Sequence, residues 1–208
     1  MVDKLGKGSF AKLKEKVKDR LFEIANDIIK LAAARELVNG IKINTDKKIL
    51  EDFQKSAGFD YTKDQKRSIR EIFTDLSSGR VMDRLLSGDV GFGKTEVAMN
   101  AMLAVILDGF QAIFVCPTTL LATQHYHSMQ KRFSEFGINI AKLDGKTSAK
   151  EKTEIKKALE KGDIKLVIGT HSLLEIKTNN LALVIIDEEH KLDRKSTRLN
   201  SSHLYTSR

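Results

Sequence analysis

Hydrophobic positions near the start of the chain recur at spacings of three and four. The stripe is formed by Phe10, Leu13, Val17, Leu21, Ile24, Ile28 and Leu31. This period predicts one face of a long amphipathic helix, and Gly40 is a suitable place for it to end. Basic residues lie largely off the stripe, at Lys12, Lys14, Lys16, Lys18 and Arg20. They indicate either a solvated face or a connector that touches nucleic acid or a neighbouring domain.

Helical and strand-like patterns alternate from residue 65 onward. Helical periodicity covers residues 65–76, 94–107, 120–136 and 149–161. Short apolar or β-branched runs predict strands within residues 81–88, 111–116, 138–143, 164–169 and 181–187. This alternation predicts an α/β fold in which a parallel sheet is covered by helices on both faces.

Composition narrows the class of protein without identifying it. A hydrophobic content of 41% with 31% charged residues is typical of a globular chain. The apolar runs are far shorter than the ~20 residues of a membrane helix, and no secretory signal pattern is present. The single cysteine, Cys116, excludes an internal disulfide framework and fits a cytoplasmic location. The net charge of +8 is compatible with a polyanionic partner, which many basic proteins nevertheless lack.

The segment "GDVGFGKT", residues 88–95, matches the phosphate-loop pattern G-x-x-x-x-G-K-[ST]. Its glycines allow backbone N–H groups to turn toward nucleotide phosphates, and the helix that follows adds its positive end. We expect Lys94 to reach the β- and γ-phosphates and the Thr95 hydroxyl to bind Mg²⁺. A strand before the loop and a helix after it disfavour a chance glycine-rich turn. The predicted ATP-binding residues here are Gly88, Asp89, Val90, Gly91, Phe92, Gly93, Lys94 and Thr95.

Two carboxylates, Asp187 and Glu188, follow the apolar run "LALVII". A carboxylate at such a strand end can hold Mg²⁺, and the next can orient the water that attacks the γ-phosphate. We therefore predict Thr95 and Asp187 as Mg²⁺ ligands, and Lys94, Asp187 and Glu188 as catalytic. A solvated acidic turn is the alternative, disfavoured by the phosphate loop upstream. For His190 we expect a sensor or coupling role, because no second His or Cys has metal-ligand spacing.

The order of five segments resembles the first RecA-like motor domain of superfamily 2 DNA translocases. These segments are "FDYTKDQ", "GDVGFGKTEVAM", "PTTLLATQH", "GTH" and "DEEH". Within this group the motifs resemble those of the bacterial transcription-repair coupling factors at four positions: Phe92, Thr119, Leu120 and Glu189. The related RecG helicases read "GDVGSGKT", "PTEILA" and "DEQH". Residues 4–35 also resemble the helix that joins the polymerase-interacting domain to the motor in the coupling-factor family.

The resemblance implies roles for further residues. Phe59 would stack on adenine and Gln65 would read the base edge, although a core position for Phe59 remains open. DNA backbone contacts fall on the segments after two strands. They are Pro117, Thr118, Thr119, Gly169, Thr170 and His171. Hydroxyl groups suit phosphate contacts that read no sequence, but each threonine could equally be an ordinary turn or helix cap.

The implied activity is ATP- and Mg²⁺-dependent translocation on double-stranded DNA, coupled to displacement of stalled RNA polymerase and recruitment of nucleotide excision repair. RNA polymerase and excision-repair proteins would bind through domains outside this chain, and no membrane contact is expected. Because the arginine of a second motor domain completes such sites, we expect the fragment alone to be inactive. Two alternatives stay open: a RecG-like branch-migration or fork-reversal helicase, and a non-hydrolysing nucleotide- or DNA-binding module.

Three regions are expected along the chain. Residues 1–40 form a basic connector helix, and residues 41–191 form a truncated N-terminal RecA-like ATP-binding domain. The family pattern continues after "DEEHK" with Phe-Gly, whereas this chain reads Leu192, and residues 193–203 match the in-frame translation of a common sequencing adapter. We therefore predict residues 192–208 to be a non-native, adapter-derived tail, disordered because it has little apolar periodicity to bury.

Overall fold

The structure is a computed structural model that describes residues 9–89, 91–176, 178, 180–188 and 202–207. The chain divides into two compact units, Met1–Asn39 and Gly40–Arg208. The first unit contains one long helix, α1 (Ser9–Glu36), which confirms the predicted helix and ends before the predicted stop at Gly40. Several large apolar side chains of α1 are exposed, at Leu13, Val17, Leu21, Phe22, Ile24 and Ile29. Among the helices of the described ranges, none is both long and apolar enough to cross a membrane.

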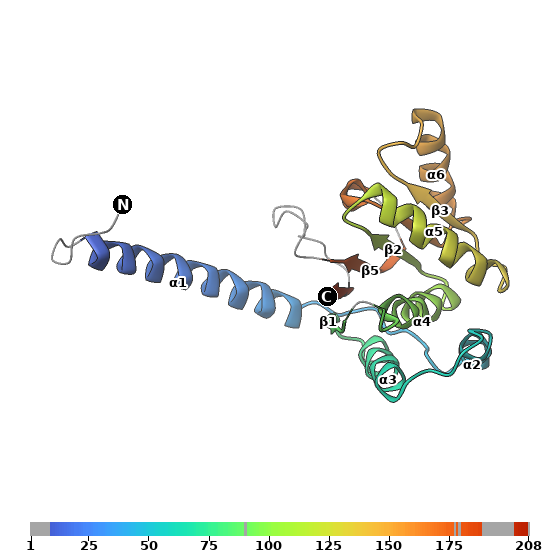
Figure 1. Cartoon of the computed structure of the whole chain (residues 1–208), viewed down its shortest axis with the longest axis horizontal. Helices are drawn as coiled ribbons and strands as arrows, with labels where there is room; N and C mark the ends of the chain where they lie inside the picture. Colours follow the sequence, from blue (N-terminus) through green and yellow to red (C-terminus); the bar gives the residue numbers. More distant parts are fainter. Residues whose placement is uncertain (1–8, 90, 177, 179, 189–201, 208) are drawn as a thin grey trace. The chain divides into compact units, whose positions relative to one another are not determined.

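The second unit is a parallel sheet with helices (Figure 1). Its helices are α2 (Lys48–Lys55), α3 (Lys63–Ser77), α4 (Lys94–Leu107), α5 (Thr119–Ser134), α6 (Ala149–Lys161) and the 3-10 helix η1 (His171–Glu175). Its strands are β1 (Asp83–Ser87), β2 (Gln111–Val115), β3 (Ile140–Leu143), β4 (Leu166–Gly169), β5 (Leu181–Asp187) and β6 (Ser202–Ser207). The strand order is β1-β6-β5-β2-β4-β3, and every pairing is parallel. The predicted α/β fold is confirmed.

Alternate strand residues pack into two separate cores, because successive side chains point to opposite faces of a sheet. One core joins Ala112 and Phe114 of β2 to helices α2, α3, α4 and α5. The other joins Ile113 and Val115 to Leu159 of α6 and to η1. Burial on both faces explains why β2, β4 and β5 read as unbroken apolar runs rather than as alternating patterns. Helices α4 and α5 thus share one face of the sheet.

Hydrogen-bonding side chains fix where two of the helices begin. A capping box of Thr62 with Gln65 starts α3, and one of Ser148 with Glu151 starts α6. Helix α2 is absent from the sequence prediction. It has eight residues and buries only Leu50 and Phe53, so its apolar period is too short to recognise.

The tail differs from its prediction. Ser202–Ser207 forms β6, which pairs in parallel with β1 on one side and with β5 on the other. The expectation of disorder is therefore wrong for these six residues. The physical reason is the sheet itself, since a strand between β1 and β5 satisfies backbone groups that would otherwise be left unpaired at two edges. The adapter origin of residues 192–208 stays a prediction, and residues 189–201 lie outside the described residues.

Candidate nucleotide and DNA site

The predicted site segments follow strands whose carboxyl ends meet at one edge of the sheet. Val115 is in register with Gly169 on one side and with Ile186 on the other. The segments after β2, β4 and β5 are therefore adjacent, and they carry the predicted DNA contacts and the two carboxylates. In open α/β sheets this edge is where ligands bind. The Cys116 N–H donates to the Gly169 carbonyl at 2.7 Å, which fixes two of these segments together.

The phosphate loop leads from β1 into α4 through glycines with left-handed backbone conformations. Gly91 has φ +85° and Gly93 has φ +71°. Gly93 is the N-cap of α4, and a Cβ at this position would collide with the Gln65 amide nitrogen. The positive φ favours glycine at Gly93, and a Cβ there would push the end of the Gln65 side chain aside. Val90 lies outside the described residues.

The Lys94 side chain folds back over the loop. Its Nζ donates to the carbonyl oxygens of Gly88 and Asp89, the latter at 2.9 Å. The ammonium group is thus held within reach of the loop backbone and of the positive N-terminus of α4. A phosphate at this place would meet both sources of positive potential. Phosphate binding by Lys94 stays a prediction.

The two carboxylates stand in different backbone conformations. Asp187 ends β5, whereas Glu188 has φ +53°, the only positive φ of a non-glycine residue in the described part of the chain. Glu188 is also buried, with 8% of its surface exposed. A glutamate in this conformation is strained, and such strain concentrates at functional sites. The arrangement sets Glu188 apart from a solvated acidic turn.

The hydroxyl of Thr95 and the carboxylate of Asp187 are hard oxygen donors and fit Mg²⁺. No group of three or more His, Cys, Asp or Glu side chains gathers as a metal site within the described ranges. Mg²⁺ does not require such a group, because it binds one or two carboxylates together with phosphates and waters. The donor set therefore suits Mg²⁺ held jointly with a nucleotide.

His125 of α5 contacts Asp187. Its Nε2 lies 3.3 Å from Asp187 Oδ2, and the two side chains are 18% and 17% exposed. The His125 ring also lies 5.1 Å from the Phe114 ring, which orients it.

Burial, and secondarily Asp187, raise the pKa of the Cys116 thiol, so this cysteine is a core side chain rather than a nucleophile. Sequence reasoning missed His125 as a neighbour of the carboxylate, and His190 lies outside the described residues.

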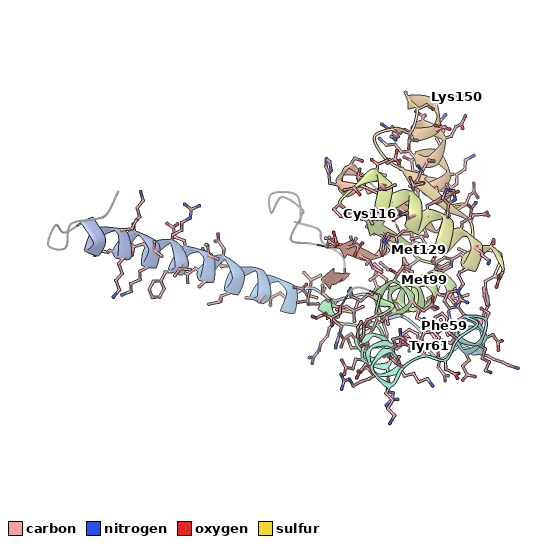
Figure 2. The ribbon with its side chains drawn as sticks, viewed as in Figure 1. Phe59, Tyr61, Met99, Cys116, Met129 and Lys150 are labelled. Carbon is pink, nitrogen blue, oxygen red and sulfur yellow. The ribbon has the colours of Figure 1, made fainter. Side chains whose placement is uncertain are left out.

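Gln65 contacts the phosphate loop, and Phe59 lies earlier in the same predicted base-recognition segment. Phe59 is 52% exposed, so the alternative that Phe59 is a core residue is wrong. The centre of its ring lies 5.5 Å from that of Tyr61, and both residues are labelled in Figure 2. Gln65 Nε2 donates to the Phe92 carbonyl at 3.0 Å, while Gln65 Oε1 accepts from the Thr62 N–H. The ring is free to stack on a base, and the amide links α3 to the loop.

A buried polar network lies behind the loop and was not predicted. Tyr61 donates to Glu96 Oε1 at 2.5 Å, and Asn100 Nδ2 donates to the Tyr61 hydroxyl at 3.1 Å. Arg132 of α5 binds the same Glu96 oxygen at 2.8 Å. Burial first, and the Glu96 hydrogen bond second, raise the pKa of Tyr61, which therefore stays a donor. The network joins the first turn of α4 to α5.

The predicted DNA-contact residues lie at the same edge with different local roles. Thr118 is exposed and caps α5, accepting from the Leu121 N–H at 3.3 Å. His171 is exposed at the start of η1, whereas Thr170 is only 9% exposed. Close packing accounts for the glycine at Gly169, because a Cβ there would collide with the Leu143 carbonyl. The helix-cap alternative is observed for Thr118, and its hydroxyl hydrogen can still be donated. DNA contact stays a prediction for all six residues.

Comparisons with known proteins show the family of the chain. The DEAD/DEAH box helicase family matches residues 62–206. The chain is 54% identical over 193 residues to the transcription-repair-coupling factor of Helicobacter pylori (strain J99), which covers 93% of this chain and 19% of that protein. It is 43% identical over 190 residues to the transcription-repair-coupling factor of Bacillus subtilis (strain 168), covering 90% of this chain and 16% of that protein.

Among solved structures, the chain is similar to RecG bound to a three-way DNA junction. The two are 41% identical with a TM-score of 0.80, covering 95% of this chain and 28% of that chain. The chain thus spans less than one fifth of either curated relative. The TM-score shows that the chain shares the fold of that RecG structure.

Proposed function

Because the chain belongs to the DEAD/DEAH box helicase family, we propose that it is the ATP-binding part of a double-stranded DNA translocase. Its hydrolysis of ATP is coupled to displacement of stalled RNA polymerase and to recruitment of nucleotide excision repair, in the cytoplasm. The carrying observation is that Lys94, Asp187 and the exposed Thr118 gather at one edge of the sheet. The names of the relatives at 54% and 43% identity support the role in repair.

In this proposal ATP binds across the phosphate loop. The loop N–H groups and Lys94 hold the phosphates, while the exposed Phe59 ring stacks on the base and Gln65 reads its edge. Thr95 and Asp187 hold Mg²⁺, which supplies charge stabilisation to the phosphates when bound. Because Gln65 also binds the Phe92 carbonyl, recognition of the base and the shape of the loop depend on one side chain.

Glu188 is the candidate for orienting the attacking water. Its carboxylate follows directly after Asp187 and is largely removed from solvent, at 8% exposure. A carboxylate in that position can accept a proton from water as it attacks the γ-phosphate. The strained φ of +53° aims this side chain in a direction that an extended residue would not reach.

DNA contact is assigned to the segments after β2 and β4. Thr118, Thr119 and His171 offer donors to phosphate oxygens, and such contacts carry no sequence information. This suits a motor that moves along any duplex. RNA polymerase and the excision-repair proteins are proposed to bind parts of the relatives that lie outside the matched segment.

A second candidate function is branch migration or fork reversal. The similarity to RecG bound to a three-way DNA junction favours it, with a TM-score of 0.80. The 41% sequence identity makes this similarity more than a likeness of fold alone. The two candidates differ in their DNA substrate and partner, not in the nucleotide site. They are therefore separated by assays on polymerase and on branched DNA.

The test is a chimaera. The matched 190-residue segment of the Bacillus subtilis relative is replaced by this chain's own segment, and release of a stalled RNA polymerase is measured with ATP. We expect release to be retained, to be lost with Lys94→Ala, and to survive Lys150→Ala, an exposed lysine on α6 (Figure 2). A folded chimaera that hydrolyses ATP without releasing polymerase would refute the repair role. Reversal of a model fork by the same chimaera would then favour the second candidate.

A further inference from the structure

One face of α5 contacts two carboxylates beside the nucleotide site, Asp187 of β5 and Glu96 of α4. His125 and Arg132 are seven residues apart, about two helical turns, and so lie on one side of the helix. His125 lies 3.3 Å from Asp187 at the end of β5. Arg132 lies 2.8 Å from Glu96, in the first turn of α4 directly after Thr95. The two contacts therefore link α5 to β5 and to α4, which both carry predicted residues of the nucleotide site.

The Arg132 contact is held in a single geometry. Its side chain is 13% exposed and that of Glu96 is 10% exposed. The guanidinium also donates to the Phe53 carbonyl at 2.8 Å and to Ser56 Oγ at 3.0 Å, and it lies 4.2 Å from the centre of the Phe53 ring. A planar guanidinium group that is hydrogen-bonded on several sides resists rotation. A shift of the first turn of α4 is therefore transmitted to α5.

The start of α5 is the candidate DNA contact. Thr118 caps the helix directly after β2 and is exposed, and Thr119 is its first residue. Hydrogen bonds along the helix make it stiff, so a force on its first turn reaches His125 and Arg132. The candidate DNA contacts and the two residues that contact the nucleotide site thus lie on one rigid helix, α5.

We propose that α5 couples DNA binding to nucleotide binding, with His125 and Arg132 as positioning residues for Asp187 and for the first turn of α4. This inference rests on the proposed function. Neither residue touches the nucleotide in this account. By linkage, duplex DNA tightens nucleotide binding by the same factor by which nucleotide tightens DNA binding.

The test measures that factor on the 208-residue chain. A fluorescent non-hydrolysable ATP analogue is titrated with Mg²⁺, without DNA and with a saturating short duplex. The ratio of the two dissociation constants is the coupling factor, which we expect to be about fivefold or more. Because it is a ratio, a change in nucleotide affinity alone cancels.

We expect His125→Ala and Arg132→Met each to reduce the coupling factor to about 1. His125→Gln should restore it, since its amide can donate from a similar position. Arg132→Lys is the second variant at its position in case Arg132→Met does not fold. This variant keeps the positive charge but loses the planar guanidinium group. Its coupling factor should therefore lie between those of the unchanged chain and His125→Ala. Matched controls on exposed positions of α5 are His127→Ala and Lys131→Met, which should leave the factor unchanged.

The outcomes separate the two proposals. Nucleotide binding with a coupling factor of about 1 in the unchanged chain overturns the inference and leaves the proposed function standing. Full coupling in both His125→Ala and Arg132→Met also overturns it, as does equal loss in the two controls. An unchanged chain that binds no nucleotide overturns the proposed function and the inference with it.

Discussion

The Gln65 side chain closes over the phosphate loop at Phe92, donating from Nε2 to the backbone carbonyl at 3.0 Å. The same amide would collide with any Cβ placed on Gly93. Gln65 also completes the capping box that starts α3. A segment expected to read the adenine base therefore also shapes the loop that holds the phosphates.

Gly93→Ala should damage nucleotide binding more than stability. Alanine at φ +71° costs about 1 kcal/mol, and its methyl group would displace the Gln65 amide from the loop. We expect at least a tenfold loss of affinity for an ATP analogue, a difference of about 1.4 kcal/mol. Fluorescence titration measures the affinity and thermal unfolding measures the stability.

Gly137→Ala is the matched control for that variant. Gly137 has φ +68°, and a Cβ there would meet no atom within 4 Å. The same backbone strain is therefore introduced far from the phosphate loop. Stability should fall by about 1 kcal/mol with nucleotide affinity unchanged. Equal affinity losses in the two variants would show that strain alone, not the loop, is responsible.

Phe59→Ala should weaken ATP binding and leave the fold intact. The ring is 52% exposed, so little buried area is lost. Stacking of a base on an aromatic ring contributes about 1–3 kcal/mol, which predicts a loss of roughly tenfold in affinity. Phe22→Ala on α1, at 59% exposure, is a matched control expected to bind normally. Unchanged affinity in Phe59→Ala would remove Phe59 from the base site.

Much of the fold is readable from the sequence, because buried strands and long helices leave strong patterns. The predicted limits of α4 and α6 agree with the structure at both ends. The phosphate-loop pattern and Asp187 stand out in the sequence for the same reason, since the chemistry predicted for them requires a fixed local spacing. The contacts of Arg132 with Glu96 and of His125 with Asp187 have no such signature. They join residues far apart in sequence and arise from packing of α5 beside α4 and β5.

Asp108 should stabilise the fold in a pH-dependent way. A hydrogen bond from Lys47, and then the Asn44 N–H, lower the pKa of Asp108 below 3.8. A lowered folded-state pKa contributes stability that is complete above the unfolded value of 3.8 and is lost as pH falls through the folded value. We expect Asp108→Asn to cost about 1 kcal/mol at neutral pH.

The pH profile of denaturant unfolding checks this assignment. The difference between the unchanged chain and Asp108→Asn should shrink as pH falls below 3.8. The exposed Asp163 provides the control, because Asp163→Asn should be nearly neutral at every pH. A difference for Asp108→Asn that persists unchanged in acid would contradict a charge-dependent contact.

Removal of residues 192–208 should destabilise the second unit. β6 pairs with five residues of β1 and five of β5, and the phosphate loop follows directly after β1. Loss of these ladders should cost roughly 3 kcal/mol or more, measured by denaturant unfolding. Leu204→Pro in the whole chain should act in the same direction, because proline cannot donate to a central ladder. Stability that is unchanged in both variants would mean that the sheet does not need this strand.

The central claim is that the chain binds ATP through its phosphate loop. The most direct measurement is equilibrium binding of a fluorescent ATP analogue to the 208-residue chain, with and without Mg²⁺. We predict saturable, Mg²⁺-dependent binding that is at least about tenfold weaker in Lys94→Ala and unchanged in Lys150→Ala. Equal binding by Lys94→Ala and the unchanged chain, or no binding by the unchanged chain, would contradict the account.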